Sequence, residues 1–299
     1  MRVLLLGADG FLGRHAADAL RALPGTTVLT GGRRAAHDLP LDLATARADV
    51  LAEQLRQLAV DAVVNFAGAV AGSAVKLAEV NARGPAVLCE ALREGAPQAR
   101  LVHIGSAGEY GACEEGTSLT ESAQPRPVGV YGATKLAGSL AVAGSGLDAV
   151  VLRVFNPVGP GAPAGSLPGR LAAELRRAGA DGVVEVGDLS AYRDFVDARD
   201  IARAVALAVS ADRPLPRVIN LASGVARPVR AIADGLVAAA AFAGRIDESG
   251  AGSERSAAVS WQQADVSLAA RELGWKPETD LDVTLRDLWS STAPEPVAG

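Results

Sequence analysis

Tyr131 and Lys135 stand four residues apart in a chain that holds only three tyrosines and three lysines. On a helix, residues four apart lie on the same face, so both side chains would point the same way. An ammonium group beside a phenol favours the phenolate and lowers the pKa of a tyrosine from about 10 toward neutrality. The pair therefore predicts a general acid or base that works at physiological pH. The alternative is a surface helix that carries the pair by coincidence.

Ser106 is the third candidate for the same chemistry. It comes just after the apolar run 101–104, which predicts a buried strand. Ligands of open parallel sheets bind outside the carboxyl ends of the strands. A hydroxyl group at that edge can hydrogen-bond to the carbonyl oxygen of a substrate. We therefore expect Ser106 at the reacting centre; the alternative is a structural loop serine.

A glycine turn with the spacing G-x-x-G-x-x-G follows the first apolar run, residues 3–6. Glycines permit a tight bend, close approach of the backbone to a pyrophosphate, and close packing of helix on sheet. The N-terminus of the following helix offers free N–H groups and the positive end of its dipole. The turn thus predicts a dinucleotide site rather than an ordinary strand-to-helix connection. Its expected contacts are Gly7, Asp9, Gly10, Phe11, Leu12 and Gly13.

The residues after the second apolar run indicate which dinucleotide is bound. An NAD site usually has an acidic residue there, whereas arginine accommodates the 2′-phosphate of NADP. The chain has Arg33 and Arg34 at this point, so we expect NADP (NADPH), with NAD as the alternative. The alternative interpretation is a solvent-exposed pair of loop arginines that binds no ligand. Besides Tyr131 and Lys135, further cofactor contacts are expected at Asp42, Leu43, Phe66, Ala67, Gly68, Asn81 and Phe155.

Alternating strand-like and helical patterns must position these residues. Compact apolar runs predict strands at 3–6, 27–30, 62–65, 101–104 and 150–154. Apolar residues at helical spacing predict helices at 11–23, 46–58, 74–93 and 131–143, and later at 167–178, 197–209, 229–241, 268–273 and 281–289. Such alternation predicts an α/β fold with a doubly wound parallel sheet of the Rossmann type.

The domain organisation follows from where this alternation loosens, after about residue 155. Residues 1–155, with parts of 190–225, are expected to form the dinucleotide-binding domain. Residues 156–189 and 226–292 are expected to form a smaller C-terminal lobe that closes over the substrate, and 293–299 a flexible tail.

Bulk composition excludes several classes of protein. The 299 residues are 49% hydrophobic and 21% charged, which is typical of a globular protein. A net charge of −5 argues against a surface that coats nucleic acid. The two cysteines and three histidines show no metal-ligand spacing, and no apolar run approaches the roughly 20 residues of a membrane span. We expect a reduced cytoplasmic protein with no metal site and no membrane partner.

The ordered set of motifs resembles the short-chain dehydrogenase/reductase family. The glycine turn, Ser106, the Tyr131–Lys135 pair and the sequence Asn65-Phe66-Ala67-Gly68 carry the resemblance. The extended branch of the family is indicated by R-V-F-N-P-V-G-P-G at 153–161, R-D-F-V-D-A-R-D at 193–200 and L-G-W-K-P at 273–277. The likeness runs from the start of the chain to about residue 289.

This resemblance implies roles for particular residues. Tyr131 would donate or accept the proton, Lys135 would also hold the nicotinamide ribose, and Ser106 would orient the carbonyl group. Extended members usually act on nucleotide-diphosphate sugars, which implies that Asn156 contacts the sugar nucleotide and Arg193 its phosphates. Arg255 is a second phosphate candidate, although Glu254-Arg255-Ser256-Ala257 departs from the family's Arg-Pro-x-Asp. Family members are commonly dimers through two helices near 74–93 and 131–143, so a homodimer is possible.

The segment before Tyr110 refines the expected reaction. Nucleotide-sugar dehydratases carry an acidic residue two positions before this tyrosine, where the chain has Gly108. Glu109 instead is similar to the Ser-x-x-Glu-Tyr-Gly of GDP-4-keto-6-deoxymannose reductases, and both residues are expected in the substrate site with Ser106. The resemblance implies NADPH-dependent reduction of the 4-keto group of a nucleotide-linked 4-keto-6-deoxy sugar. Open alternatives are an NAD-dependent 4-epimerase, a reductase of another carbonyl, and a non-catalytic nucleotide sensor.

Overall fold

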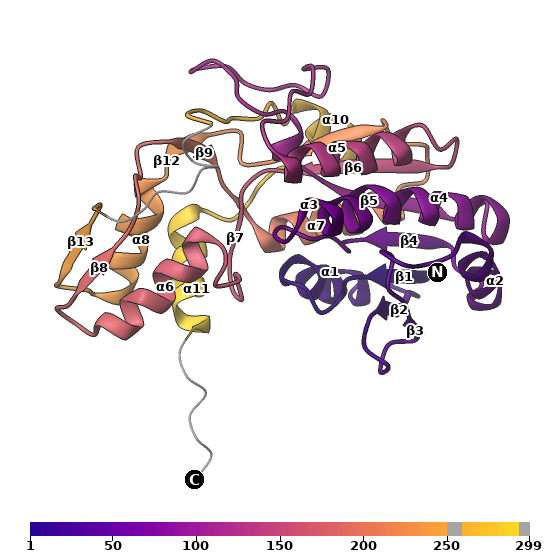
Figure 1. Cartoon of the computed structure of the whole chain (residues 1–299), viewed down its shortest axis with the longest axis horizontal. Helices are drawn as coiled ribbons and strands as arrows, with labels where there is room; N and C mark the ends of the chain where they lie inside the picture. The colour runs from indigo at the N-terminus through magenta and orange to yellow at the C-terminus, as the bar shows by residue number, and fades with distance from the viewer. Residues whose placement is uncertain (250–258, 293–299) are drawn as a thin grey trace, which may run out of the picture.

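The fold is built on a parallel β-sheet whose strands are connected by helices (Figure 1). The computed structural model describes residues 1–249 and 259–292. Within them, seven parallel strands are arranged in the order β11-β6-β5-β4-β1-β2-β3. These strands are β1 (Arg2–Leu6), β2 (Thr27–Gly32), β3 (Leu39–Pro40), β4 (Ala62–Asn65), β5 (Arg100–Ser106), β6 (Ala149–Val154) and β11 (Val218–Leu221).

Helices cover both faces of the sheet. Successive side chains of a strand point to opposite faces, so Val3 and Leu5 join one hydrophobic cluster and Leu4 and Leu6 another. The first face is covered by α1 (Phe11–Arg21), α7 (Ala198–Ser210) and α10 (Ser267–Leu273). The second is covered by α2 (Ala48–Leu58), α4 (Gly84–Gly95) and α5 (Val130–Ala143). The predicted doubly wound α/β fold is therefore confirmed.

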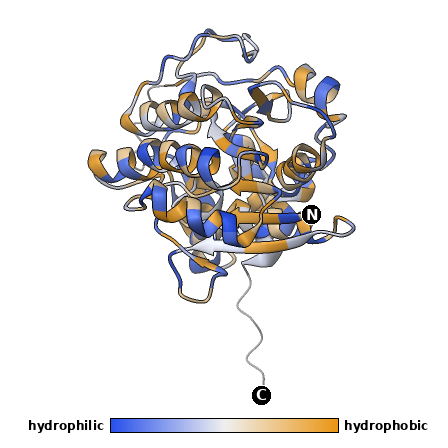
Figure 2. Cartoon of the chain, turned by 90° about the vertical axis from the view of Figure 1, so that its right-hand side faces the viewer, coloured by the Kyte–Doolittle hydropathy of each residue, from blue (hydrophilic) through white to orange (hydrophobic). Residues whose placement is uncertain are grey.

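Hydrophobic and hydrophilic residues alternate along the helices in Figure 2. This is the pattern of helices that bury one side against a sheet and expose the other. Among the described residues, no helix is long and apolar enough to cross a membrane.

A separate hydrophobic cluster holds the later part of the chain together, to the left of the sheet in Figure 1. Its helices are α6 (Leu167–Ala178), α8 (Arg230–Ala240) and α11 (Leu281–Ser291). Its short strand pairs are β7 (Pro157–Val158) with β10 (Val196–Asp197), β8 (Val183–Glu185) with β13 (Arg245–Asp247), and β9 (Tyr192–Asp194) with β12 (Ala226–Pro228). This second core supports a smaller lobe, whose boundaries stay a prediction; the tail 293–299 lies outside the described residues.

One predicted helix differs from the structure. Residues 74–93 form α3 (Ala74–Ala78), a π-helical turn (Glu79–Arg83) and α4 in succession. Pro85 in the first turn of α4 has no N–H to continue a regular ladder of hydrogen bonds. The wider turn points Asn81 inward, where its amide bonds to the loop after β4.

Candidate active site

The turn between β1 and α1 is packed so closely that Gly7 and Gly13 have no room for a side chain. Gly7 has φ +80°, and a Cβ atom there would lie 2.9 Å from the Ala67 nitrogen. A Cβ on Gly13 would lie 2.1 Å from the Gly7 carbonyl oxygen. Gly10 is the N-cap residue of α1. Because glycine has no side chain, the cap forms no side-chain hydrogen bond to the first N–H groups of the helix. This close-packed turn with free N–H groups fits the pyrophosphate of a dinucleotide.

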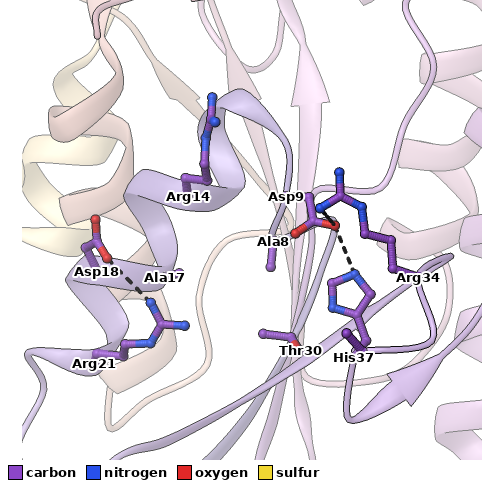
Figure 3. A pocket seen from close by; sticks show the side chains of 10 residues that line it. Ala8, Asp9, Arg14, Ala17, Asp18, Arg21, Thr30, Arg34 and His37 are labelled. Carbon is purple, nitrogen blue, oxygen red and sulfur yellow. Dashed lines mark hydrogen bonds and ion pairs between the residues drawn. The ribbon is translucent and has the colours of Figure 1, made fainter. Parts of the chain in front are cut away.

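A cavity of about 440 Å³ opens beside this turn (Figure 3). On one side, Asp9 Oδ2 lies 3.5 Å from Arg34 Nη1 and 3.0 Å from His37 Nε2. Arg14 and Arg21 line the opposite side from α1. Arg33 is exposed on the same loop as Arg34. His37 and the contact of Asp9 with Arg34 could not be predicted from local sequence, because these partners are far apart along the chain.

Ser106 and Tyr131 both lie close to Gly108 at the carboxyl end of β5. A Cβ atom on Gly108 would lie 3.4 Å from both Ser106 Oγ and Tyr131 Cε1. Ser106 Oγ accepts a hydrogen bond of 3.1 Å from the Gly108 nitrogen. A Cβ on Gly132 would lie 2.3 Å from the Gly108 carbonyl oxygen, so this glycine lets α5 approach the turn closely. The structure thus brings the Ser106 hydroxyl group and the Tyr131 ring to the same glycine, while their part in a reaction stays a prediction.

Lys135 lies buried one turn beyond Tyr131 on α5. Its Nζ donates a hydrogen bond of 2.5 Å to the Ile104 carbonyl oxygen on β5. Burial lowers the pKa of Lys135 to about 8, and the negative charge of Glu109 opposes this shift. The ammonium form therefore predominates at neutral pH, next to the tyrosine that it is predicted to activate.

Glu109 does not face a substrate site. It is fully buried, and its carboxylate accepts hydrogen bonds of 2.8 Å from the Ser106 nitrogen, Ser139 Oγ and Arg153 Nε. The Glu109 carboxylate can be buried because it forms an ion pair with Arg153, and a buried carboxylate is stable only when it is paired and hydrogen-bonded. The expected direct contact of Glu109 with the substrate is thus replaced by contacts inside the protein.

The remaining cofactor candidates differ in their burial and in their hydrogen-bond partners. Asn81 is buried and exchanges two hydrogen bonds of 2.8 Å with the backbone of Ala69, so it shapes the loop after β4. Phe155 is fully buried against the Tyr110 ring, and its backbone nitrogen donates to the Leu221 carbonyl oxygen. Asp42 bonds to the Ala44 nitrogen. Leu43 is buried, while Phe66, Ala67 and Gly68 continue from the end of β4 beside the glycine turn.

The substrate candidates of the second lobe lie near this edge. Asn156 Nδ2 donates to the Asp194 carbonyl oxygen at 2.9 Å and to Gln262 Oε1 at 3.2 Å. Gln262 in turn donates to the Ala107 carbonyl oxygen, next to Ser106. No local sequence signal marks Gln262. Arg255 lies outside the described residues.

Arg193 is a half-buried cation on β9. Its Nη1 donates to the Tyr192 carbonyl oxygen at 2.7 Å, and burial lowers its pKa. Within residues 1–249 and 259–292 it forms no ion pair with a carboxylate. A partly desolvated guanidinium without such a partner is suited to an anionic ligand.

The family model "NAD dependent epimerase/dehydratase family" matches residues 3–222. The chain belongs to this family of NAD(P)-dependent enzymes, and the resemblance to the extended short-chain dehydrogenase/reductases is confirmed. Within the described residues, no group of three or more histidine, cysteine, aspartate or glutamate side chains could hold a metal ion.

Individual proteins similar to the chain cover nearly its whole length. It is 37% identical to a dTDP-6-deoxy-L-talose 4-dehydrogenase (NAD(P)(+)) from Kitasatospora kifunensis, over 99% of this chain and 97% of that protein. The solved structure of RMD from Pseudomonas aeruginosa complexed with NADPH superposes with a TM-score of 0.83 at 24% identity, covering 97% and 98% of the two chains. MoeE5 in complex with UDP-glucuronic acid and NAD gives a TM-score of 0.83 at 26% identity, covering 98% and 99%.

Proposed function

We propose that this protein uses NADPH to reduce the 4-keto group of a nucleotide-diphosphate 4-keto-6-deoxy sugar. The observation that supports the proposal is that Ser106 and Tyr131 both lie close to Gly108, with Lys135 buried one turn beyond Tyr131 on α5. Gly108 supplies no carboxylate for the removal of water from a sugar, so carbonyl reduction is favoured over dehydration. The 4-dehydrogenase relative supports the choice of carbon, because oxidation of a hydroxyl group at C4 is the reverse of this reduction.

The residues of the chain divide the work of the reaction. Gly7, Gly10 and the first turn of α1 would hold the pyrophosphate of the cofactor, which supplies a hydride to the carbonyl carbon. Ser106 would donate a hydrogen bond to the carbonyl oxygen. Tyr131 would give its phenolic proton to the same oxygen as negative charge develops there. The Lys135 ammonium, fixed by the Ile104 carbonyl, would stabilise the phenolate that remains.

Arg193 is proposed to bind the diphosphate of the substrate. Changing Arg193→Met removes the charge but keeps an apolar side chain, so KM for the sugar nucleotide should rise by about 10- to 100-fold, as expected for a lost charge-assisted contact. The dissociation constant for NADPH should stay unchanged. Arg227, directly opposite Arg193 on β12 and exposed, is the matched control. Equal KM values for Arg193→Met and Arg227→Met would remove Arg193 from the substrate site.

NADPH is proposed over NADH because Arg34 and His37 provide donors at the expected position of the 2′-phosphate. The Asp9 carboxylate also contacts both of these side chains, so it would compete with the phosphate for them. Changing Arg34→Ala should weaken NADPH binding by about 5-fold, and Asp9→Asn should strengthen it by a similar factor, since exposed charge pairs contribute up to about 1 kcal/mol. NADH binding should change little in both variants. Fluorescence titration with each reduced cofactor measures this, with Arg177→Ala, an exposed arginine on α6 that does not line this cavity, as control. Equal effects on NADH and NADPH would argue for NAD.

A 4-epimerase is the second candidate, because the family is named for epimerases and MoeE5 was solved with NAD. It would use the same tyrosine and lysine but retain NAD through each turnover. Denaturing the purified protein and quantifying the released dinucleotide separates the two: stoichiometric NAD supports the epimerase, and its absence supports the reductase. A homodimer and a cytoplasmic location stay predictions.

A further inference from the structure

The Glu109 carboxylate joins three separate elements at one buried point. Its Oε1 accepts hydrogen bonds of 2.8 Å from the Ser106 nitrogen at the end of β5 and from Ser139 Oγ on α5. Its Oε2 accepts a hydrogen bond of 2.8 Å from Arg153 Nε on β6. The side chains of Glu109, Ser139 and Arg153 are all at least nine-tenths buried. An unpaired donor or charge at this buried point would be costly. The Glu109 side chain is therefore restricted to conformations that accept all three hydrogen bonds at once.

Two of these donors belong to the elements that carry the reacting groups. Ser106 provides its own backbone N–H, and Ser139 stands one turn beyond Lys135 and two turns beyond Tyr131 on α5. One carboxylate oxygen therefore holds the loop of the serine hydroxyl against the helix of the phenol. We propose that Glu109 is a positioning residue of the active site, which fixes Ser106 relative to Tyr131 and Lys135. This inference rests on the proposed catalytic roles of those three residues.

The charge of Glu109 has a second effect on the same site. Lys135 and Arg153 are two buried cations near the single Glu109 carboxylate. The other titratable groups close to Lys135 are His103 on β5, whose pKa burial lowers well below its usual value, and Tyr131 on α5. Removing the negative charge would leave the two cations uncompensated, so Lys135 would lose its proton at a lower pH.

Two single substitutions separate geometry from charge. Ser139→Ala removes one hydrogen bond and no charge, so kcat should fall by about 10-fold, with KM, the dissociation constant for NADPH and the pH profile unchanged. Glu109→Gln keeps the size of the side chain and removes its charge. It should lower kcat by about 100-fold and also move the alkaline limb of the pH profile to lower pH.

A third variant keeps the comparison interpretable if Glu109→Gln folds poorly. The double change Glu109→Gln with Arg153→Met removes both charges of the ion pair, which should restore folding and return the alkaline limb toward that of the wild type while kcat stays low. Wild-type kcat in Ser139→Ala, or in a folded Glu109→Gln with an unmoved pH profile, would overturn the proposal. These comparisons use whichever substrate the wild type converts, so an inactive wild type would count against the proposed reaction and not against this role of Glu109.

Discussion

Replacing Tyr131 with phenylalanine is expected to lower kcat by about 100- to 10,000-fold, the range that a positioned general acid contributes. The substitution removes only the phenolic oxygen. The ring still packs beside Gly108, so the site should keep its structure. The dissociation constant for NADPH should therefore stay within about 2-fold of the wild-type value. The measurement is kcat under saturating substrate together with a fluorescence titration of NADPH.

The matched control for this variant is Tyr192→Phe. Tyr192 lies on β9, stacks on Trp261 and has no proposed part in proton transfer. Its loss of a hydroxyl group should leave kcat unchanged. If Tyr131→Phe kept wild-type turnover, another group would have to supply the proton and the proposed mechanism would be wrong.

Turnover of the wild type is expected to decline as the pH rises through the pKa of Lys135, about 8. Burial depresses this pKa below the usual 10.5, so the ammonium form is present below about pH 8 and is lost above it. Without the ammonium group, the phenolate of Tyr131 loses its stabilising charge. Lys135→Met should therefore lower kcat by about 100-fold or more at neutral pH and remove this alkaline limb.

Lys276→Met is the control for the lysine, because Lys276 is exposed and distant from α5 in sequence. It should retain both the turnover and the alkaline limb of the wild type. An alkaline limb that persists in Lys135→Met would assign the titration to another group.

Local patterns were sufficient to predict five of the seven strands of the sheet and to propose the catalytic residues. The strand 62–65 and the helix 167–178 were predicted with their observed bounds, because apolar periodicity and the flanking breakers are local properties. The strands β3 and β11 were not predicted: β3 has only two residues, and the apolar run of β11 is interrupted by Asn220, whose side chain bonds to Tyr110 and Leu119. The predicted helix 74–93 was wrong in its middle, where the π-helical turn depends on contacts of Asn81 with Ala69 and Thr134.

The surroundings of the site depend on partners that are distant along the chain. Glu109 faces inward because Arg153 arrives on the neighbouring strand β6. The pairing of β2 with β1 brings Arg34 and His37 close to Asp9. Residue types and spacing therefore predict which groups react, whereas the fold determines which of them are paired within the protein, as Glu109 is.

The near-ultraviolet absorbance of reduced nicotinamide provides the decisive test of the proposed reduction. Purified protein is mixed with NADPH or NADH and with dTDP-4-keto-6-deoxyglucose or GDP-4-keto-6-deoxymannose, and Tyr131→Phe serves as the blank. NADPH is expected to be consumed with one of these sugars, faster than NADH, while the absorbance of the blank stays constant. No consumption with either sugar, together with NAD that co-purifies with the protein, would contradict the reductase and establish the epimerase as the better interpretation.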